Sequence, residues 1–165
     1  MPDSPPPQRP QVTRRALLRR GTAGGLVVGG AVATYAASKA AAKHGEVVVR
    51  NVGAIETRED GRRYSVSLFY HELDDDGPDE PQVHEAAEGR LEGGSSVDDP
   101  YRVPDTLHRD LAAEFENLTY HVGHRCPNAR CSTPRVGRGA FNDLSLGTSV
   151  DLLYLPSSAR AVRVP

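Results

Sequence analysis

Tryptophan is absent from this sequence, and other residues that fill cores or build cofactor sites are scarce. Its 165 residues include three phenylalanines, six tyrosines, one methionine and two cysteines. There is no G-x-S-x-G elbow and no glycine-rich phosphate loop, so neither the hydrolase nor the nucleotide-binding motif is present. Aromatic side chains contribute the largest burials in a core, so we expect one small domain with a modest core.

Lysine is also missing beyond Lys43, where every cation is an arginine. From Lys43 onward the chain holds 14 basic and 21 acidic residues, whereas residues 1–42 hold six basic residues and one acid. The body is therefore anionic, which predicts that nucleic acid is not a partner. An acidic, lysine-poor surface is typical of halophiles, and a GC-rich genome produces the same bias, so both explanations stay open.

The N-terminal segment is cationic and differs from the rest of the chain. Residues 1–12 are polar and proline-rich, which predicts disorder. They are followed by Thr13-Arg14-Arg15-Ala16-Leu17-Leu18-Arg19, which resembles the twin-arginine export signal. In that signal a Ser or Thr precedes two arginines, any residue, two apolar residues and a basic one. The resemblance implies that Arg14 and Arg15 form an export motif and that the body works outside the cytoplasmic membrane, secreted or anchored.

An apolar stretch follows the arginine pair, and residues 13–42 together form the expected signal or anchor. Gly21 to Ser38 gives 18 residues without a charge, rich in glycine and alanine. Ala40-Ala41-Ala42 offers an A-x-A-like cleavage site, so the segment can be a removable signal. Uncleaved, residues 21–42 would anchor the chain in the cytoplasmic membrane as a helix, since the 18 uncharged residues reach about 27 Å, just enough to span its core. A soluble Ala/Gly helix is the third alternative.

The expected domain covers residues 45–165 and begins with a β-hairpin. Residues 46–57 are rich in valine and other apolar residues typical of strands, and Asp60-Gly61 is a hairpin-turn dipeptide. Apolar and polar residues alternate in residues 62–71. The alternation puts Tyr64, Val66, Leu68 and Tyr70 on one face and Ser65, Ser67 and His71 on the other, with Phe69 as an exposed exception.

An acidic segment interrupts this pattern. Residues 72–100 hold 11 acids, one base and three prolines, which predicts a solvated loop insertion over residues 72–103 with a short helix at His84–Leu91. Asp74-Asp75-Asp76 could bind a cation, but position 12 of the calcium-loop template is Val83 instead of Glu, so a solvated loop is favoured.

The remaining sequence predicts one helix and further strands. Residues 104–116 place Leu107, Leu111 and Phe115 on one helical face, with Asp105 or Thr106 as a cap. Residues 118–124, 149–155 and 159–164 read as strands. The predicted fold is therefore mainly β (α+β): a small antiparallel sheet or partly open barrel of about five strands with one short helix.

The tail is similar to a family of membrane-tethered β domains of unknown function. In this family a G-x-x-V-x-V-x-Y-x-P strand closes a small sheet after a single helix, and here the corresponding segments are Leu146–Pro156 and Ala159–Val164. Tyr64–Tyr70 resembles the earlier Y-x-V-x-Y strand of the family. The resemblance implies a non-enzymatic envelope domain.

One stretch is chemically dense, because both cysteines and two of the six histidines lie close together in it. Cys126 and Cys131 form an even pair in an exported domain, which favours a disulfide. Alternatively, His121, His124, Cys126 and Cys131 could bind zinc as an N2S2 shell, although a three-residue spacing puts the histidines on opposite faces of a strand. A reactive thiol activated by Arg125 and Arg130, or inert free thiols, are the remaining alternatives.

No catalytic residues are predicted, and no cofactor is expected unless the zinc alternative holds. Asn117-Leu118-Thr119 is a glycosylation sequon, which requires Asn117 to lie at an exposed helix-to-strand corner. We expect a non-enzymatic envelope domain that binds a protein or wall component. The alternatives are an exported metal-binding or thiol-redox module and a single-helix subunit of a membrane complex.

Overall fold

A computed structural model describes residues 41–96, 98–127, 133–155 and 160–164. The chain divides into two compact units, Met1–Tyr35 and Ala36–Pro165, and all described residues belong to the second. The predicted disordered segment 1–12, nearly all of the signal segment 13–42 and the pair Arg14 and Arg15 lie outside them. None of the helices in the described part is long and apolar enough to span a membrane.

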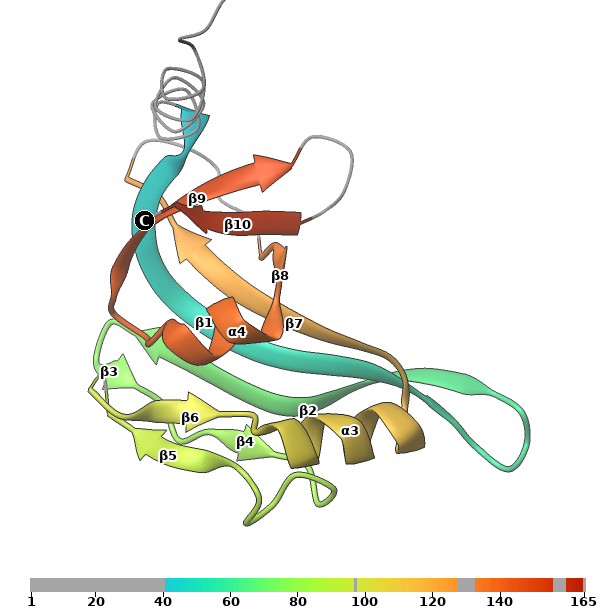
Figure 1. The fold of residues 1–165 in the computed structure, drawn as a ribbon. Helices are drawn as coiled ribbons and strands as arrows, with labels where there is room; N and C mark the ends of the chain where they lie inside the picture. Colours follow the sequence, from blue (N-terminus) through green and yellow to red (C-terminus); the bar gives the residue numbers. More distant parts are fainter. Residues whose placement is uncertain (1–40, 97, 128–132, 156–159, 165) are drawn as a thin grey trace, which may run out of the picture. The chain divides into compact units, whose positions relative to one another are not determined.

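The described part is mainly β, as the sequence predicts, and the expected hairpin is present. Strand β1 (Lys43–Thr57) pairs antiparallel with β2 (Arg63–Asp74) (Figure 1). Gly61 in the connecting turn has φ 75°, a conformation that glycine adopts without strain. The hairpin is confirmed, with β1 beginning at Lys43 instead of Glu46.

One feature of this hairpin differs from the prediction. A register shift between Val52 and Gly53 reverses the alternation along β2, so that Leu68 and Phe69 are both buried. Phe69 is 1% exposed and His71 is 2% exposed, whereas Tyr64 is exposed. The expected exposure of Phe69 is therefore wrong, because an extra residue in one strand turns every later side chain to the other face.

Strand β1 pairs with three other strands, because different parts of its length face different partners. It pairs antiparallel with β7 (Glu116–Arg125) along most of its length and with β9 (Ser149–Leu155) at its beginning. The pairings continue from β7 through β8 (Arg135–Val136) and β10 (Arg160–Val164) to β9, which closes a circuit back to β1. The sheet has eight strands and contains the parallel pair β8–β10, so it is larger than the five-stranded antiparallel prediction.

The acidic segment is not the solvated loop that its composition predicts. It contains the short strands β3 (Gly77–Pro78), β4 (Gln82–Val83), β5 (Glu92–Ser95) and β6 (Pro100–Arg102). Residues 85–90 form turns instead of the expected helix. Ala87 and Val103 are each 1% exposed, so a few apolar residues anchor the segment to the core while its carboxylates remain in water.

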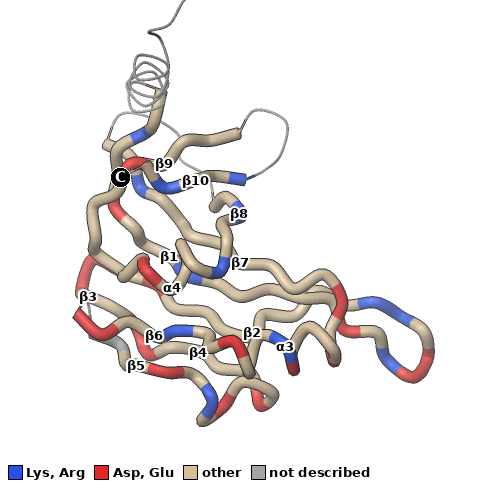
Figure 2. Tube along the Cα trace, viewed as in Figure 1, with Lys and Arg blue, Asp and Glu red and all other residues tan. Residues whose placement is uncertain are grey.

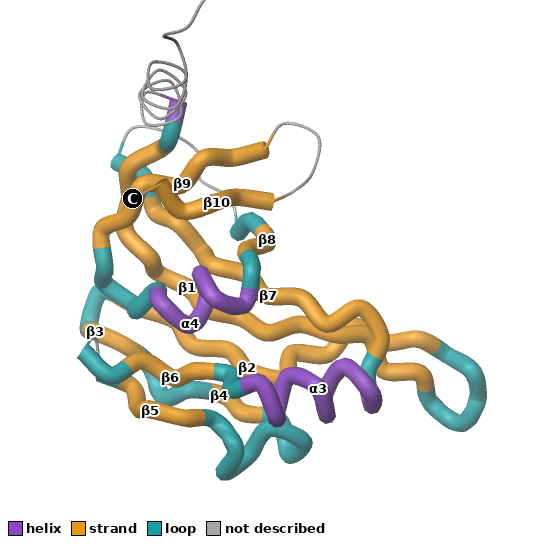
Figure 3. The backbone as a smooth tube through the Cα atoms, in the orientation of Figure 1, coloured by secondary structure: helices purple, strands orange, loops and turns teal. Residues whose placement is uncertain are grey.

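The predicted helix is present, and a second one accompanies it (Figure 3). Helix α3 (Asp105–Glu114) buries Leu107 and Leu111, and Phe115 follows it into the core, which confirms the apolar stripe. Its N-cap is Pro104 without a side-chain cap, so the expected capping by Asp105 or Thr106 is wrong. Helix α4 (Arg138–Asp143) was not expected and buries Phe141.

The core lies on one face of β1, β2 and β7, and the helices and the acidic segment cover this face. It includes Val52, Leu68, Val122, Leu111 and Phe141. Arg50 also lies there at 1% exposure and donates to the backbone oxygens of Tyr101 (2.6 Å) and Phe141 (2.9 Å). Burial lowers the pKa of Arg50 to about 10. This arginine links β6 and α4 to the core face of the sheet. The opposite face of β1 is covered by neither element.

Candidate functional site

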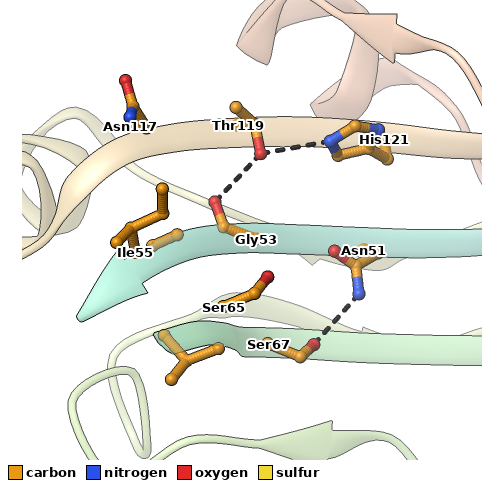
Figure 4. Close-up of a pocket in the computed structure, with 10 residues that line it drawn as sticks. Asn51, Gly53, Ile55, Ser65, Ser67, Asn117, Thr119 and His121 are labelled. Carbon is orange, nitrogen blue, oxygen red and sulfur yellow. Dashed lines mark hydrogen bonds between the residues drawn. The ribbon is translucent and has the colours of Figure 1, made fainter. Parts of the chain in front are cut away.

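The opposite face of β1, β2 and β7 is hollowed into an open groove of about 430 Å³ (Figure 4). Alternation along the three strands turns small polar side chains to this face wherever their neighbours enter the core. The groove residues are Asn51, Gly53, Ala54 and Ile55 of β1, Ser65, Val66 and Ser67 of β2, and Asn117, Thr119 and His121 of β7. Amides, hydroxyls, one imidazole and the apolar residues Ala54, Ile55 and Val66 therefore line the groove, and none of its lining residues is Asp, Glu, Lys or Arg.

Hydrogen bonds hold these side chains in place. Asn51 donates from Nδ2 to Ser67 Oγ at 3.0 Å, and Thr119 Oγ1 donates to the backbone oxygen of Gly53 at 3.0 Å (Figure 4). His121 lies with Nε2 3.1 Å from Thr119 Oγ1 and Nδ1 3.3 Å from the backbone oxygen of Thr133. The groove therefore presents an ordered set of uncharged donors and acceptors instead of mobile side chains.

Gly53 forms the floor of the groove. A Cβ at this position would come within 3.3 Å of both Asn51 Oδ1 and Thr119 Oγ1, so a larger residue would fill the hollow and crowd both side chains. Glu116, the register partner of Ile55, forms an ion pair with Arg63 at 2.7 Å. A neutral groove is notable in a body with 14 basic and 21 acidic residues after residue 42.

The structure separates the two histidines of the predicted metal set. His121 lies in the groove, whereas His124 is 3% exposed on the other face of β7. His124 donates from Nε2 to the backbone oxygen of Val150 (3.2 Å), and its Nδ1 lies 3.1 Å from the Tyr154 hydroxyl. Burial lowers the pKa of His124, and hydrogen bonds to the backbone of Val150 and Gly45 partly oppose this shift.

Only one of the two predicted cysteines is in the described part of the chain. Cys126 Sγ lies 3.5 Å from His124 Nδ1, so these two members of the predicted set do meet. Cys131 and Arg130 lie outside the described residues, and the disulfide between Cys126 and Cys131 stays a prediction. Within the described residues, no group of three or more His, Cys, Asp or Glu side chains could hold a metal ion.

Asn117 lies where the sequon requires. It is exposed at the corner between α3 and β7, with a φ of 51°, and it lines one end of the groove. Glycosylation itself stays a prediction. The groove could not be predicted as a site, because its residues come from three strands and each alone reads as an ordinary outward-facing position.

The fold and the groove place this chain in a broad structural class. It is a small, mainly β domain with an open groove that no Asp, Glu, Lys or Arg lines. Comparison of the chain with protein families, with curated proteins and with solved structures found no match.

Proposed function

We propose that this chain is an exported or membrane-tethered envelope domain that binds a protein or wall partner and does not act as an enzyme. The groove on β1, β2 and β7 is its contact surface. The circuit of strands from β1 to β9 is the rigid scaffold, which we interpret as a small, partly open barrel. The observation that carries the proposal is the uncharged, hydrogen-bonded lining of the groove in a strongly acidic body.

The chemistry of the lining favours an uncharged, hydrogen-bonding polymer as the partner. Asn51, Ser65 and Ser67 offer amide and hydroxyl groups that match the hydroxyls of a glycan or the amides of an extended peptide. Such a partner brings no charge whose desolvation would oppose binding. An open groove also suits a chain that enters and leaves at both ends, whereas an enclosed cavity would suit a small molecule.

A steric block tests the groove without disturbing the core. Ser65 is exposed and lines the groove, while Ser149 is an exposed strand residue outside it. We expect the full chain and its Ser149→Phe variant to co-sediment with lipid-extracted envelope fragments, and Ser65→Phe to stay in the supernatant. Equal sedimentation of all three proteins, or of none, would contradict the proposal.

A second function is favoured by the approach of His124 Nδ1 to Cys126 Sγ at 3.5 Å. In this alternative Cys126, which is disulfide-bonded in the structure, and Cys131 form an exported thiol-redox module or, once reduced, a metal-binding module with zinc as the candidate metal. Metal analysis of protein folded in the cytoplasm distinguishes the two proposals. A stoichiometric metal that is lost in Cys126→Ser, and kept in His121→Ala, would favour the module over the binding domain.

A further inference from the structure

A second hollow lies among α3, β7, β8, α4, β9 and β10, and it differs chemically from the groove. Its volume is about 510 Å³, and we call it the arginine cleft. It is lined by His108, Leu118, Thr119, Tyr120, Arg135, Val136, Gly137, Arg138, Leu155, Arg160, Ala161 and Val162. Three of these described residues are arginines and none is acidic.

The arginines of the cleft are close together because of the strand pairing. Arg135 of β8 and Arg160 of β10 are register partners in the parallel pair, and Arg138 begins α4 two residues beyond β8 (Figure 2). Like charges placed opposite one another on neighbouring strands destabilise a sheet unless an anion separates them. Among the described residues, neither Arg135 nor Arg160 takes part in an ion pair.

The third arginine is already held in place. Arg138 donates from Nη1 to the backbone oxygen of Val103 at 3.1 Å and pairs through Nη2 with Asp105. Its charge is therefore balanced by Asp105, and its role is to fix the wall of the cleft. Arg135 and Arg160 supply the uncompensated positive charge, in a body where acids outnumber bases.

A hydrogen-bonding pair and an apolar wall complete the cleft. The Tyr120 hydroxyl lies 2.8 Å from His108 Nδ1, and burial raises the pKa of Tyr120 to about 12, so the hydroxyl keeps its proton at neutral pH. Leu155 and Val162 are 39% and 49% exposed, and they are two of the three large hydrophobic residues exposed in the described part. The cleft has positive charge on one side and exposed apolar surface on the other. A ligand that fits it has an anionic group and an apolar part.

We propose that the arginine cleft binds an organic carboxylate with an apolar body. The guanidinium groups of Arg135 and Arg160 receive the carboxylate, because their planar N–H donors match its two oxygens. Leu155 and Val162 cover the hydrocarbon part. The volume is in the range of small-molecule sites, which is about 300–1,000 Å³. Thr119 is the one residue that lines both the cleft and the groove, and it is changed in neither test, so either site can fail its test without the other.

Calorimetric titration of the full chain with octanoate and with octanol, both below the concentrations at which they aggregate, tests this proposal. We expect octanoate to bind at least about tenfold more tightly than octanol, since hydrogen bonds to a charged group contribute that much. Arg160→Gln should weaken octanoate binding by a similar factor. Arg163→Gln is the matched control, because Arg163 lies on the same strand, is exposed and does not line the cleft.

Val162→Ser tests the apolar wall separately and lies at an exposed position, so folding should be preserved. We expect it to weaken octanoate binding and to leave acetate binding unchanged, because acetate has almost no hydrocarbon part to contact Val162. Equal binding of octanoate and octanol would overturn the proposal, and so would equal weakening by Arg160→Gln and Arg163→Gln. Acetate binding as tight as octanoate would reduce the cleft to a site for simple anions and overturn the amphipathic ligand.

Discussion

At the scale of single residues, the most unusual side chain is the buried cation Arg50. Its guanidinium carbon lies 4.4 Å from the ring centroid of Phe141, and its Nε is a buried atom without a hydrogen-bond partner. The two carbonyl oxygens that it satisfies belong to β6 and α4, and the rings of Tyr101 and Phe141 also pack against Phe69 of β2. A cation near the last turn of α4 is also favoured by the helix dipole.

Arg50→Ala should therefore destabilise the domain strongly. The substitution leaves a cavity beside Phe69 and Phe141 and removes the donor from two buried carbonyl oxygens, each of which costs about 1–3 kcal/mol when left unpaired. Denaturant unfolding of the full chain measures the effect. Arg109→Ala, on the exposed face of α3, should change the free energy of unfolding by less than about 0.5 kcal/mol. Similar values for both variants would show that Arg50 does not link these elements.

His71 should make the domain sensitive to acid. Burial lowers the pKa of His71, although its hydrogen bond to the backbone oxygen of Asp79 opposes the shift and the charge of Arg50 adds to it. The unfolded chain takes up a proton near pH 6.5 and the folded one at lower pH, so stability is complete above pH 6.5 and falls below it, by at most about 1.4 kcal/mol per pH unit.

The measurement is the free energy of unfolding between pH 7.5 and pH 5. We expect His71→Gln to reduce this dependence and to leave the part due to His124, because glutamine keeps a donor for Asp79 but does not titrate. If the slope of the variant equals that of the unmodified chain, His71 is not a source of the acid sensitivity.

At the scale of elements, two glycines allow β1 and β7 to approach closely. A Cβ on Gly123 would lie 2.6 Å from Val49 Cβ, and one on Gly45 would lie 2.7 Å from His124 Nε2 and closer still to the backbone oxygen of Arg125. Both glycines lie at the end of the β1–β7 ladder where the register shifts between Val47 and Val49. The strand pairing there depends on the absence of side chains.

Gly123→Ala should therefore lower the free energy of unfolding by about 1–3 kcal/mol, because the new methyl group overlaps Val49. Gly139→Ala is the matched control. Nothing lies within 4 Å of a Cβ on Gly139, which is in α4, so this change should stabilise the helix by about 0.5–1 kcal/mol. Opposite signs for the two variants in thermal unfolding are expected, and equal signs would contradict the packing at Gly123.

The elements that the sequence predicted are those with a strong local pattern. The hairpin and α3 follow from alternation and from the stripe Leu107, Leu111 and Phe115. Helix α4 has only six residues and contains Gly139, so it has neither the length nor the propensity that a periodicity argument needs. The burial of Phe69 and His71 depends on the register shift at Leu68, an extra residue in β2 that has no partner in β1 and that the alternation of the sequence does not reveal.

The two hollows were less predictable than the fold. Asn51, Ser67 and Thr119 come together only through the register of three strands, and Arg135 meets Arg160 through one parallel pairing. The dense stretch that drew attention in the sequence is divided by the structure, with His121 on one face of β7 and His124 on the other. A three-residue spacing on a strand does predict that separation.

At the scale of the whole molecule, the location of the domain decides which of its proposed partners it can meet. The proposal of an envelope role depends on the resemblance of residues 13–19 to a twin-arginine signal, and Arg14 and Arg15 carry that resemblance. A planar guanidinium with five N–H donors and a compact ammonium are recognised differently, so we expect a change that keeps the positive charge of the pair to abolish export. Arg14→Lys with Arg15→Lys is such a change.

Fractionation of cells that produce the full chain, followed by immunodetection, measures the outcome. We expect the unmodified chain outside the cytoplasmic membrane and the double-lysine variant inside the cell. Arg19→Lys with Arg20→Lys is the matched control, because it makes the same chemical change beyond the pair and should leave export intact. Export of the double-lysine variant at the normal level would remove the basis for the envelope role, while the groove and the arginine cleft would keep their own tests. If both double-lysine variants stay inside the cell, arginines beyond the pair are also required, and the resemblance to the twin-arginine signal fails.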